Sequence, residues 1–274
     1  MGYLQNLHQH TCYCDGKNTP EEVVQEALKR NFKSIGFSGH SHMSFSDAPA
    51  MNPEKLALYK ADIARLQEKY GEQIDIFCGL EEDMLSKSDL SGFDYVIGSC
   101  HFLLQGDEYI DFDRDAATVA QIIQKNFGGD GMAYAKAYYA QLATLPEFGK
   151  FDIVGHFDLI TKHCETTDFF DLESKEYRYA ALEAMEALAG KIPYFEVNTG
   201  AIARGYRTTA YPMPWFIKEF KRLGFGVIIS SDCHDKNFLD CYFREAEQLL
   251  LDCGYREKFV LTKNGFMPVG LEKA

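Results

Sequence analysis

The segment Ile74-Asp75-Ile76-Phe77-Cys78-Gly79-Leu80 is a short, mostly apolar run that ends directly at an acidic residue, Glu81. Its length and composition are typical of a buried strand. A carboxylate at the end of such a strand is costly to desolvate unless it is paired or bound to a metal ion. By itself, Glu81 is as readily explained by a salt bridge, so its meaning depends on the rest of the chain.

The same pattern recurs in five other places, where a short apolar run leads into histidine or aspartate. These are residues 3–7 before His8 and His10, 34–37 before His40 and His42, 95–100 before His101, 151–155 before His156, and 225–231 before Asp232 and His234. Seven of the eight histidines therefore follow such runs. If the runs are parallel strands, their carboxyl ends meet at one edge and the polar side chains converge there. The pattern thus indicates a hydrolase with several metal ions.

Helical patterns separate the apolar runs, and this alternation predicts βα units around a parallel sheet. Thr19-Pro20-Glu21-Glu22 has the composition of a helix start with a capping box. We expect strands at 3–8, 34–38, 74–80, 95–100, 151–155, 194–198 and 225–231, and helices at 20–30, 53–70, 115–127, 132–144, 172–189, 214–223 and 239–253. Seven such strands predict an α/β fold, a distorted (β/α)7 TIM-like barrel, with residues 1–274 as a single domain.

Composition excludes several classes of protein. The formal net charge of −13 disfavours nonspecific binding to nucleic acid, whose phosphates need a basic surface. No apolar run is long enough to span a membrane, and the amino terminus lacks the pattern of a signal peptide. The eight cysteines are scattered, and the spacing of Cys12 and Cys14 does not match a zinc finger. We therefore expect a cytoplasmic enzyme with free thiols; the sequence does not indicate its oligomeric state.

The spacing within two of the clusters favours metal binding. In an extended chain, residues two apart point to the same side, so His8 and His10 can reach one ion, and Asp232 and His234 repeat the same spacing near the end of the chain. A lone pair of this kind is weak support, and His101 or His156 alone is more often a hydrogen-bonded residue at a strand end. Together the nine side chains are hard to explain by chance: His8, His10, Asp15, His40, Glu81, His101, His156, Asp232 and His234.

At this level of detail the chain resembles the PHP (polymerase and histidinol phosphatase) family. The resemblance is carried, in the family's order, by His8-Gln-His10-Thr11, Asp15-Gly16, Gly39-His40, Gly79-Leu80-Glu81, Ser99-Cys-His101, Gly155-His156-Phe157-Asp158, Glu196-Val-Asn198-Thr199 and Ser231-Asp232-Cys-His234. These motifs span the chain nearly end to end. The length resembles that of the stand-alone phosphatases of the family and not that of a much larger polymerase.

The resemblance implies a trinuclear metal site. The first divalent ion would take His8, His10, Glu81 and Asp232; the second would share Glu81 and add His101 and His156; the third would take Asp15, His40 and His234. Imidazole and carboxylate ligands suit Zn, Mn or Fe, and the sequence does not choose among them. Three divalent ions with three carboxylates would also leave about three positive charges for an anionic substrate.

The resemblance further implies phosphomonoester hydrolysis, with L-histidinol phosphate as the substrate and metal-activated hydroxide attacking phosphorus. Asp232 would serve this chemistry as well as metal binding. A family member acting on another small phosphate ester is the main alternative. A non-catalytic metal-binding module is disfavoured by the complete ligand set.

The remaining polar residues include candidates for substrate binding. Arg204 and Arg207 follow the run at 194–198, and a planar guanidinium binds phosphate with two hydrogen bonds. Arg204 is the stronger candidate, and both could instead be solvated loop residues. His42 could face the cavity and bind phosphate or protonate the leaving oxygen, or lie on the surface. Lys162 and His163 are interpreted as loop residues, although Lys162 could reach a phosphate. Acidic loop residues such as Asp47, Glu82 or Asp158, unranked, are candidates for binding the imidazole and amine.

Overall fold

The computed structural model describes residues 3–271 and contains a sheet of seven parallel strands. They are β1 (Gln5–Asn6), β2 (Ser34–Phe37), β3 (Asp75–Asp83), β4 (Tyr95–Ser99), β7 (Ile153–Val154), β8 (Tyr194–Asn198) and β9 (Gly226–Ser230). Neighbours in the sheet follow this order, and each pairs in parallel with the next. The predicted distorted (β/α)7 barrel is therefore confirmed; that residues 1–274 form a single domain stays a prediction, and its ends, 1–2 and 272–274, lie outside the described residues.

The barrel closes only at its rim. No ladder joins β9 to β1, but an isolated parallel bridge pairs Gln9 with Cys233, and the backbone amide of His10 donates to the Cys233 carbonyl at 2.9 Å. Below it, the side-chain amide of Asn6 donates to the Ser231 hydroxyl at 2.7 Å. The closure thus holds the segments carrying His10 and Asp232 side by side.

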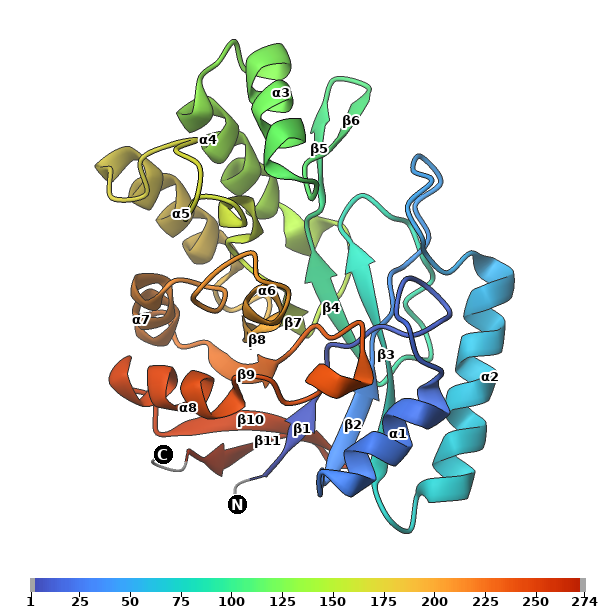
Figure 1. Cartoon of the computed structure of the whole chain (residues 1–274). Helices are drawn as coiled ribbons and strands as arrows, with labels where there is room; N and C mark the ends of the chain where they lie inside the picture. The colour runs from blue at the N-terminus through green and yellow to red at the C-terminus, as the bar shows by residue number, and fades with distance from the viewer. Residues whose placement is uncertain (1–2, 272–274) are drawn as a thin grey trace.

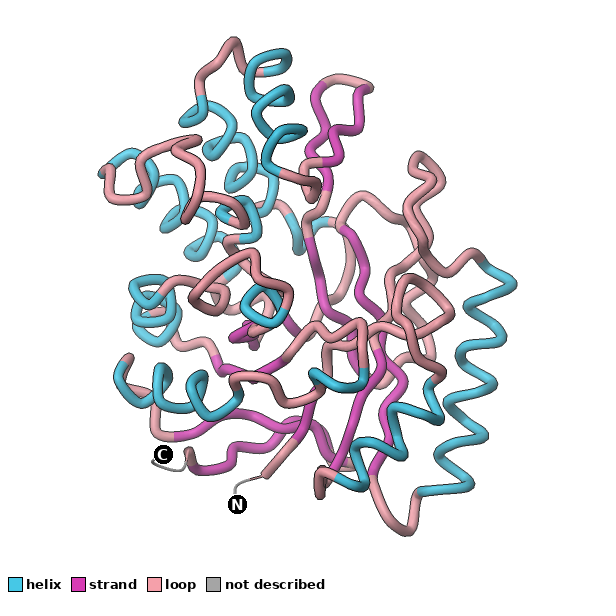
Figure 2. The backbone as a smooth tube through the Cα atoms, viewed as in Figure 1, coloured by secondary structure: helices cyan, strands magenta, loops and turns pink. Residues whose placement is uncertain are grey.

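Helices surround the strands (Figures 1 and 2). They are α1 (Pro20–Lys29), α2 (Pro53–Tyr70), α3 (Ala116–Asn126), α4 (Gly131–Leu142), α5 (Lys175–Leu188), α6 (Gly200–Ala203), α7 (Pro214–Arg222) and α8 (Phe243–Asp252), with 3-10 turns at Leu145–Glu147, Leu159–Thr161 and Lys236–Phe238. The capping box at Thr19 forms: its hydroxyl accepts from the Glu22 amide at 3.3 Å, and its own amide donates to the Glu22 carboxylate at 2.9 Å. The last helix starts later than predicted because Tyr242 has a left-handed backbone, φ 55°, that no helix can contain.

Two antiparallel hairpins were not predicted. β5 (Phe102–Gln105) and β6 (Glu108–Asp111) rise beyond β4 at the carboxyl end of the barrel, and β10 (Glu257–Thr262) and β11 (Gly265–Gly270) lie at the opposite end (Figure 1). The second hairpin is attached to β1, because the side chain of Gln5 bonds both the amide and the carbonyl of Leu261 at 2.7 Å. Asn264-Gly265 is a hairpin signal that could have located it.

One tyrosine forms the floor of the barrel beneath the strand ends. Tyr95 of β4 is 1% exposed, and its hydroxyl donates to the carbonyl of Leu7 across the barrel. Its ring passes over Gly79 and Gly36, where any Cβ would overlap it. Glycine at these two positions therefore makes the room for the ring that separates the apolar interior from the polar rim.

Two further expectations concern the state of the cysteines and the presence of a membrane-spanning helix. All eight cysteines fall within residues 3–271 and are free thiols. In the same range, no helix combines the length and the apolar character needed to cross a membrane.

Candidate metal centre

Polar side chains from all seven barrel strands or the loops that follow them converge at the carboxyl ends. They border a cavity of about 320 Å³ lined by Asp15, His40, Glu81, His101, Asp113, His156, Leu159, Lys162, Arg204, Tyr206, Tyr211, Asp232 and His234. His8 and His10 lie buried beneath it. The ligand types that the sequence scatters over more than 220 positions are thus brought together, as the barrel predicts.

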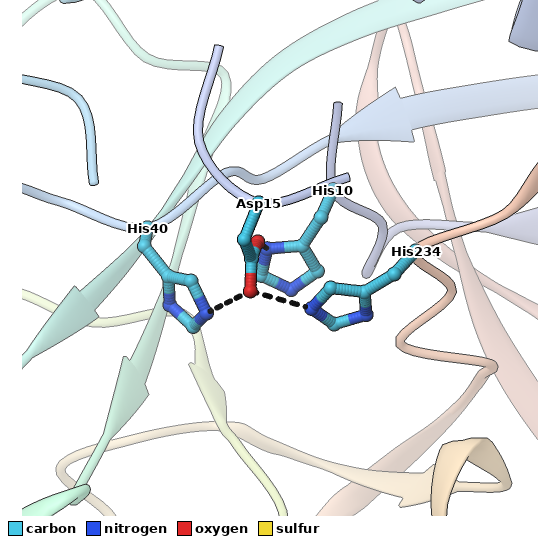
Figure 3. A group of neighbouring side chains, drawn as sticks. All are labelled: His10, Asp15, His40 and His234. Carbon is cyan, nitrogen blue, oxygen red and sulfur yellow. Dashed lines mark hydrogen bonds and ion pairs between the residues drawn. The ribbon is translucent and has the colours of Figure 1, made fainter. Parts of the chain in front are cut away.

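Asp15 is the centre of one group of four side chains (Figure 3). Its Oδ2 lies 3.1 Å from Nε2 of His234 and 3.7 Å from Nε2 of His40, and its Oδ1 lies 3.3 Å from Nδ1 of His10. The rings of His10 and His234 stack with centroids 4.0 Å apart. This group contains all three ligands expected for the third ion and adds His10 to them.

Glu81 faces two sets of histidines with its two oxygens. Oε1 lies 3.0 Å from Nε2 of His156 and 3.3 Å from Nε2 of His101. Oε2 lies 2.8 Å from Nδ1 of His40 and 3.3 Å from Nε2 of His8. Because each oxygen faces different imidazoles, Glu81 has the geometry of a carboxylate that bridges two ions.

Asp232 links the histidines to the arginine side of the cavity. Its Oδ1 lies 3.2 Å from Nε2 of His10 and 3.7 Å from Nε2 of His8. Its Oδ2 accepts from Arg204 Nη2 at 3.0 Å and from Asn198 Nδ2 at 3.3 Å. The residue has a left-handed backbone, φ 44°, which aspartate tolerates better than most residues.

Several buried polar atoms of these histidines and carboxylates make no hydrogen bond. Nε2 of His8, Nε2 of His10 and Oε2 of Glu81 are fully buried and make no hydrogen bond. Native proteins rarely bury such atoms without a hydrogen bond, and several of them that face one another are suited to bind a cation. Imidazole nitrogens and carboxylate oxygens are the donor set of Zn, Mn and Fe sites, so the residues fit divalent metal ions.

The charges in the cluster depend on one another. Burial alone would raise the pKa of Glu81, but the imidazoles of His8, His40 and His101 outweigh it and hold this pKa well below its usual range. Burial likewise opposes the charged form of His8, yet the carboxylates of Glu196, Glu81 and Asp232 raise its pKa to about 10. At His8 the neighbouring carboxylates thus favour the protonated imidazole, and a metal ion that binds there has to displace this proton.

Glu196 is an important residue to which the sequence assigned no role. It is fully buried and its carboxylate accepts from Nδ1 of His8 at 2.9 Å and from the backbone amide of His156 at 2.7 Å. The hydroxyl of Ser230 and the amide of Asn198 donate to it at 2.5 and 2.9 Å. A carboxylate on Nδ1 leaves Nε2 of His8 as the free ligand atom. A charged residue inside the predicted strand 194–198 was the signal in the sequence that could have identified Glu196.

The structure separates the two candidate arginines. Arg204 lines the cavity, and its Nη1 donates to the Asp232 carbonyl at 2.7 Å. Arg207 is 5% exposed and does not line the cavity. Its guanidinium bonds Thr161 at 2.5 Å, lies 3.6 Å from Asp158, and packs on the ring of Tyr211. Arg207 thus lies outside the cavity with its guanidinium facing the buried carboxylate of Asp158, and this position does not support the prediction that it binds substrate.

The other candidates for substrate binding differ in whether they line the cavity. His42 is exposed and does not line the cavity; it lies one residue beyond Ser41, the last bridged residue of this segment. His163 instead bonds the Arg114 carbonyl at 2.8 Å. Lys162 does line the cavity, whereas Asp47, Glu82 and Asp158 do not. Tyr206, Tyr211 and Asp113 complete the wall and were not predicted.

Comparison with known proteins agrees with this geometry. A probable histidinol-phosphatase of Deinococcus radiodurans is 29% identical over 273 residues, covering 93% of this chain and 96% of the relative. The histidinol-phosphatase of Bacillus subtilis is 26% identical over 248 residues, covering 83% and 92%. The histidinol phosphate phosphatase of Lactococcus lactis, crystallised with zinc, L-histidinol and phosphate, is 22% identical with a TM-score of 0.73, covering 96% and 98%.

The family comparison covers most of the chain. Residues 6–200 match the model of the PHP domain. This range includes seven of the nine predicted ligands, from His8 to His156, while Asp232 and His234 lie beyond it and reach the site through the barrel closure. The fold shared with the Lactococcus enzyme extends over nearly the whole of both chains. The chain therefore belongs to the PHP domain family.

Proposed function

We propose that this protein is a metal-dependent phosphoric monoester hydrolase that converts L-histidinol phosphate and water to L-histidinol and phosphate. The observation that carries the proposal is the cavity itself, which combines several overlapping metal-binding groups with the cation of Arg204. The relatives named histidinol-phosphatase, which match over most of their length, support the choice of substrate.

Three divalent ions, of Zn, Mn or Fe, are proposed to occupy the site. We assign His8, His10, Glu81 and Asp232 to the first, Glu81 with His101 and His156 to the second, and Asp15, His40 and His234 to the third. The ligand atoms of the third set lie close together, as do those of His8, His10 and Asp232 of the first. His101 and His156 lie in two separate groups, each of which includes Glu81. When bound, such ions lower the pKa of water to about 7 and offset the charge of a phosphate ester. The unpaired buried atoms of His8, His10 and Glu81 support this assignment.

The chain's own residues orient the ester. Arg204 is held by the carbonyl and the carboxylate of Asp232, so its guanidinium is fixed at the wall of the cavity, beside His234. We assign to it the binding of the non-bridging phosphate oxygens. Asp232 thus contributes twice, as a ligand and as the group that positions the arginine. In the reaction, the oxygen of water forms the new bond to phosphorus and the bond between phosphorus and the ester oxygen breaks. A proton goes to the departing alkoxide.

The test is phosphate release by purified protein loaded with Zn²⁺ or Mn²⁺. We expect kcat/KM for L-histidinol phosphate to exceed that for glycerol, sugar and nucleoside phosphates. Asp232→Ala should abolish turnover with an unchanged circular-dichroism spectrum, and His163→Ala, outside the cavity, should retain it. Rescue of a histidine auxotroph lacking its histidinol phosphatase tests the activity in cells. Faster turnover of another ester would support the alternative specificity, and no phosphate release from any ester would refute the proposal.

A further inference from the structure

One carboxylate in the cavity wall belongs to none of the metal-binding groups. Asp113 lies in the loop between β6, which ends at Asp111, and α3, which begins at Ala116. Its Oδ1 accepts from Nζ of Lys162 at 2.7 Å, and its side chain is 33% exposed to the cavity. The ammonium group of Lys162 also packs on the ring of Tyr206, 4.6 Å from its centroid. Lys162 thereby fixes Asp113 through one oxygen.

A negative group at this position opposes the binding of a phosphate dianion. Asp113 acts electrostatically on His101, His156 and Arg204, so it lies within range of the centre of the site. Burial would raise its pKa, but Lys162 and the two imidazoles outweigh this and keep the pKa below its usual value, so the group is ionised. Like charges in a shielded cavity repel one another. This unfavourable arrangement becomes favourable if the ligand carries a cation beside its phosphate.

The proposed substrate has such a cation. In L-histidinol phosphate the ammonium group sits on the carbon next to the ester-bearing carbon, so the residue that binds it has to lie in the same cavity as the phosphate. The candidates from the sequence, Asp47, Glu82 and Asp158, lie outside the cavity. Asp111 also does not line it, and pairs with Arg114 at 2.6 Å. Among the described residues, Asp113 is the cavity-lining carboxylate that remains once the metal-binding groups are set aside.

We propose that Asp113 is a specificity-determining residue that binds the substrate's ammonium group through its carboxylate, with Lys162 holding that carboxylate in place. The inference rests on the proposed function and names the group that selects the substrate. It also implies selection against other esters, because a phosphate without a neighbouring cation meets only repulsion at Asp113.

The decisive variant is Asp113→Asn, assayed as the metal-loaded enzyme on L-histidinol phosphate and on its deamino analogue, 3-(imidazol-4-yl)propyl phosphate. We expect kcat/KM for L-histidinol phosphate to fall by about 10- to 100-fold, mainly through KM, as is usual when a hydrogen bond to a charged group is lost. Turnover of the deamino analogue should stay the same or rise. An equal loss for both esters would overturn the proposal, because it would mean that Asp113 serves only to position Lys162.

Asp111→Asn is the matched control, since it removes a neighbouring carboxylate outside the cavity and should leave both esters unaffected. A second pair, phosphoethanolamine and ethyl phosphate, separates this inference from the proposed function. If the wild-type enzyme ignores L-histidinol phosphate but prefers phosphoethanolamine to ethyl phosphate, and Asp113→Asn removes that preference, only the proposed function fails. If the wild type shows no preference for the aminated member of either pair, the role of Asp113 is refuted.

Discussion

Two buried carboxylates organise the histidines of the metal centre in different ways. Glu81 faces imidazoles directly with both oxygens, whereas Glu196 accepts hydrogen bonds from Nδ1 of His8 and from backbone and side-chain donors around it. The first is proposed to touch the metal ions, and the second sets the tautomer and orientation of a ligand. A ligand histidine whose second nitrogen is held in this way needs no reorganisation when the ion binds.

Glu196→Gln tests this positioning role. An amide keeps the size of the carboxylate but presents a donor to a site surrounded by donors, so we expect metal affinity to fall by about 10- to 100-fold. Competition with a chromophoric chelator measures the affinity directly, without turnover. Glu82→Gln is the matched control: Glu82 is also buried, but it bonds the Ser88 amide and should leave metal affinity unchanged. Equal affinities for wild type and Glu196→Gln would contradict the role.

Among the elements, the strands depend on one another through side chains that cross the barrel. Tyr95 extends from β4 across the glycines of β3 and β2 to a carbonyl beyond β1. The ring can take this path only where its neighbours lack a Cβ. The polar residues at the carboxyl ends of the strands therefore lie above the ring of Tyr95, whose position depends on Gly36 and Gly79.

Gly79→Ala should destabilise the barrel by about 1–3 kcal/mol, the usual cost of overpacking a filled interior. The added Cβ would overlap the ring of Tyr95, which is buried. Urea unfolding measures the change. Gly270→Ala, in β11 with no atom near the new Cβ, is the control and should change stability by much less. If the two variants unfold alike, Tyr95 does not fill the floor as described.

The first two helices are joined by an ionic cluster that responds to pH. Glu21 of α1 contacts Lys69, Tyr70 and Arg65 of α2, and Lys69 in particular lowers the pKa of Glu21 from 4.5 to about 2. A depressed carboxyl pKa contributes stability that is complete above about pH 4.5 and disappears as the pH falls through about 2.

Glu21→Gln should therefore lower the urea midpoint slightly at pH 7, and the difference from wild type should shrink between pH 4.5 and pH 2. Paired urea titrations across this range make the measurement. Glu68→Gln, which removes an exposed carboxylate of α2 instead, is the control. A gap that persists undiminished at pH 2 would show that the ion pairs are not its source.

For the whole molecule, metal binding and barrel closure are coupled. The proposed ligands come from segments after β1, β2, β4, β7 and β9 and from β3. The segments of β9 and β1 meet through the bridge of Gln9 with Cys233 and the hydrogen bond from Asn6 to Ser231. An ion shared by His8, His10 and Asp232 would join the two sides of this seam. Metal ions are therefore expected to stabilise the closed barrel as well as to serve the reaction.

Removal of the metal with a chelator should lower the melting temperature, and Zn²⁺ or Mn²⁺ should restore it. Free metal at 100 times its dissociation constant stabilises a protein by about 2.7 kcal/mol per site. Calorimetry with metal analysis makes the measurement, and chelator already saturated with metal is the control. His163→Ala should respond like wild type, whereas His8→Ala should respond less. An unchanged melting temperature after complete metal loss would separate metal binding from stability.

The sequence by itself determined the barrel and the set of metal-binding candidates. Alternation of apolar runs with helical patterns is local, and the ends of parallel strands converge in any barrel, so His8, Glu81 and His234 could be grouped without coordinates. Periodicity and position along the chain were enough for this purpose.

Only the tertiary structure decided the rest of the cavity. Arg204 and Arg207 look alike in sequence, but one faces the cavity and the other neutralises Asp158, which depends on residues about 50 positions away. His42 lies outside the cavity, one residue beyond the last bridged residue of its segment. Asp113 lies in the cavity wall, on the loop that follows an unpredicted hairpin. Such placements follow from loop conformation and long-range pairing of charges, neither of which leaves a periodic pattern in the amino-acid sequence.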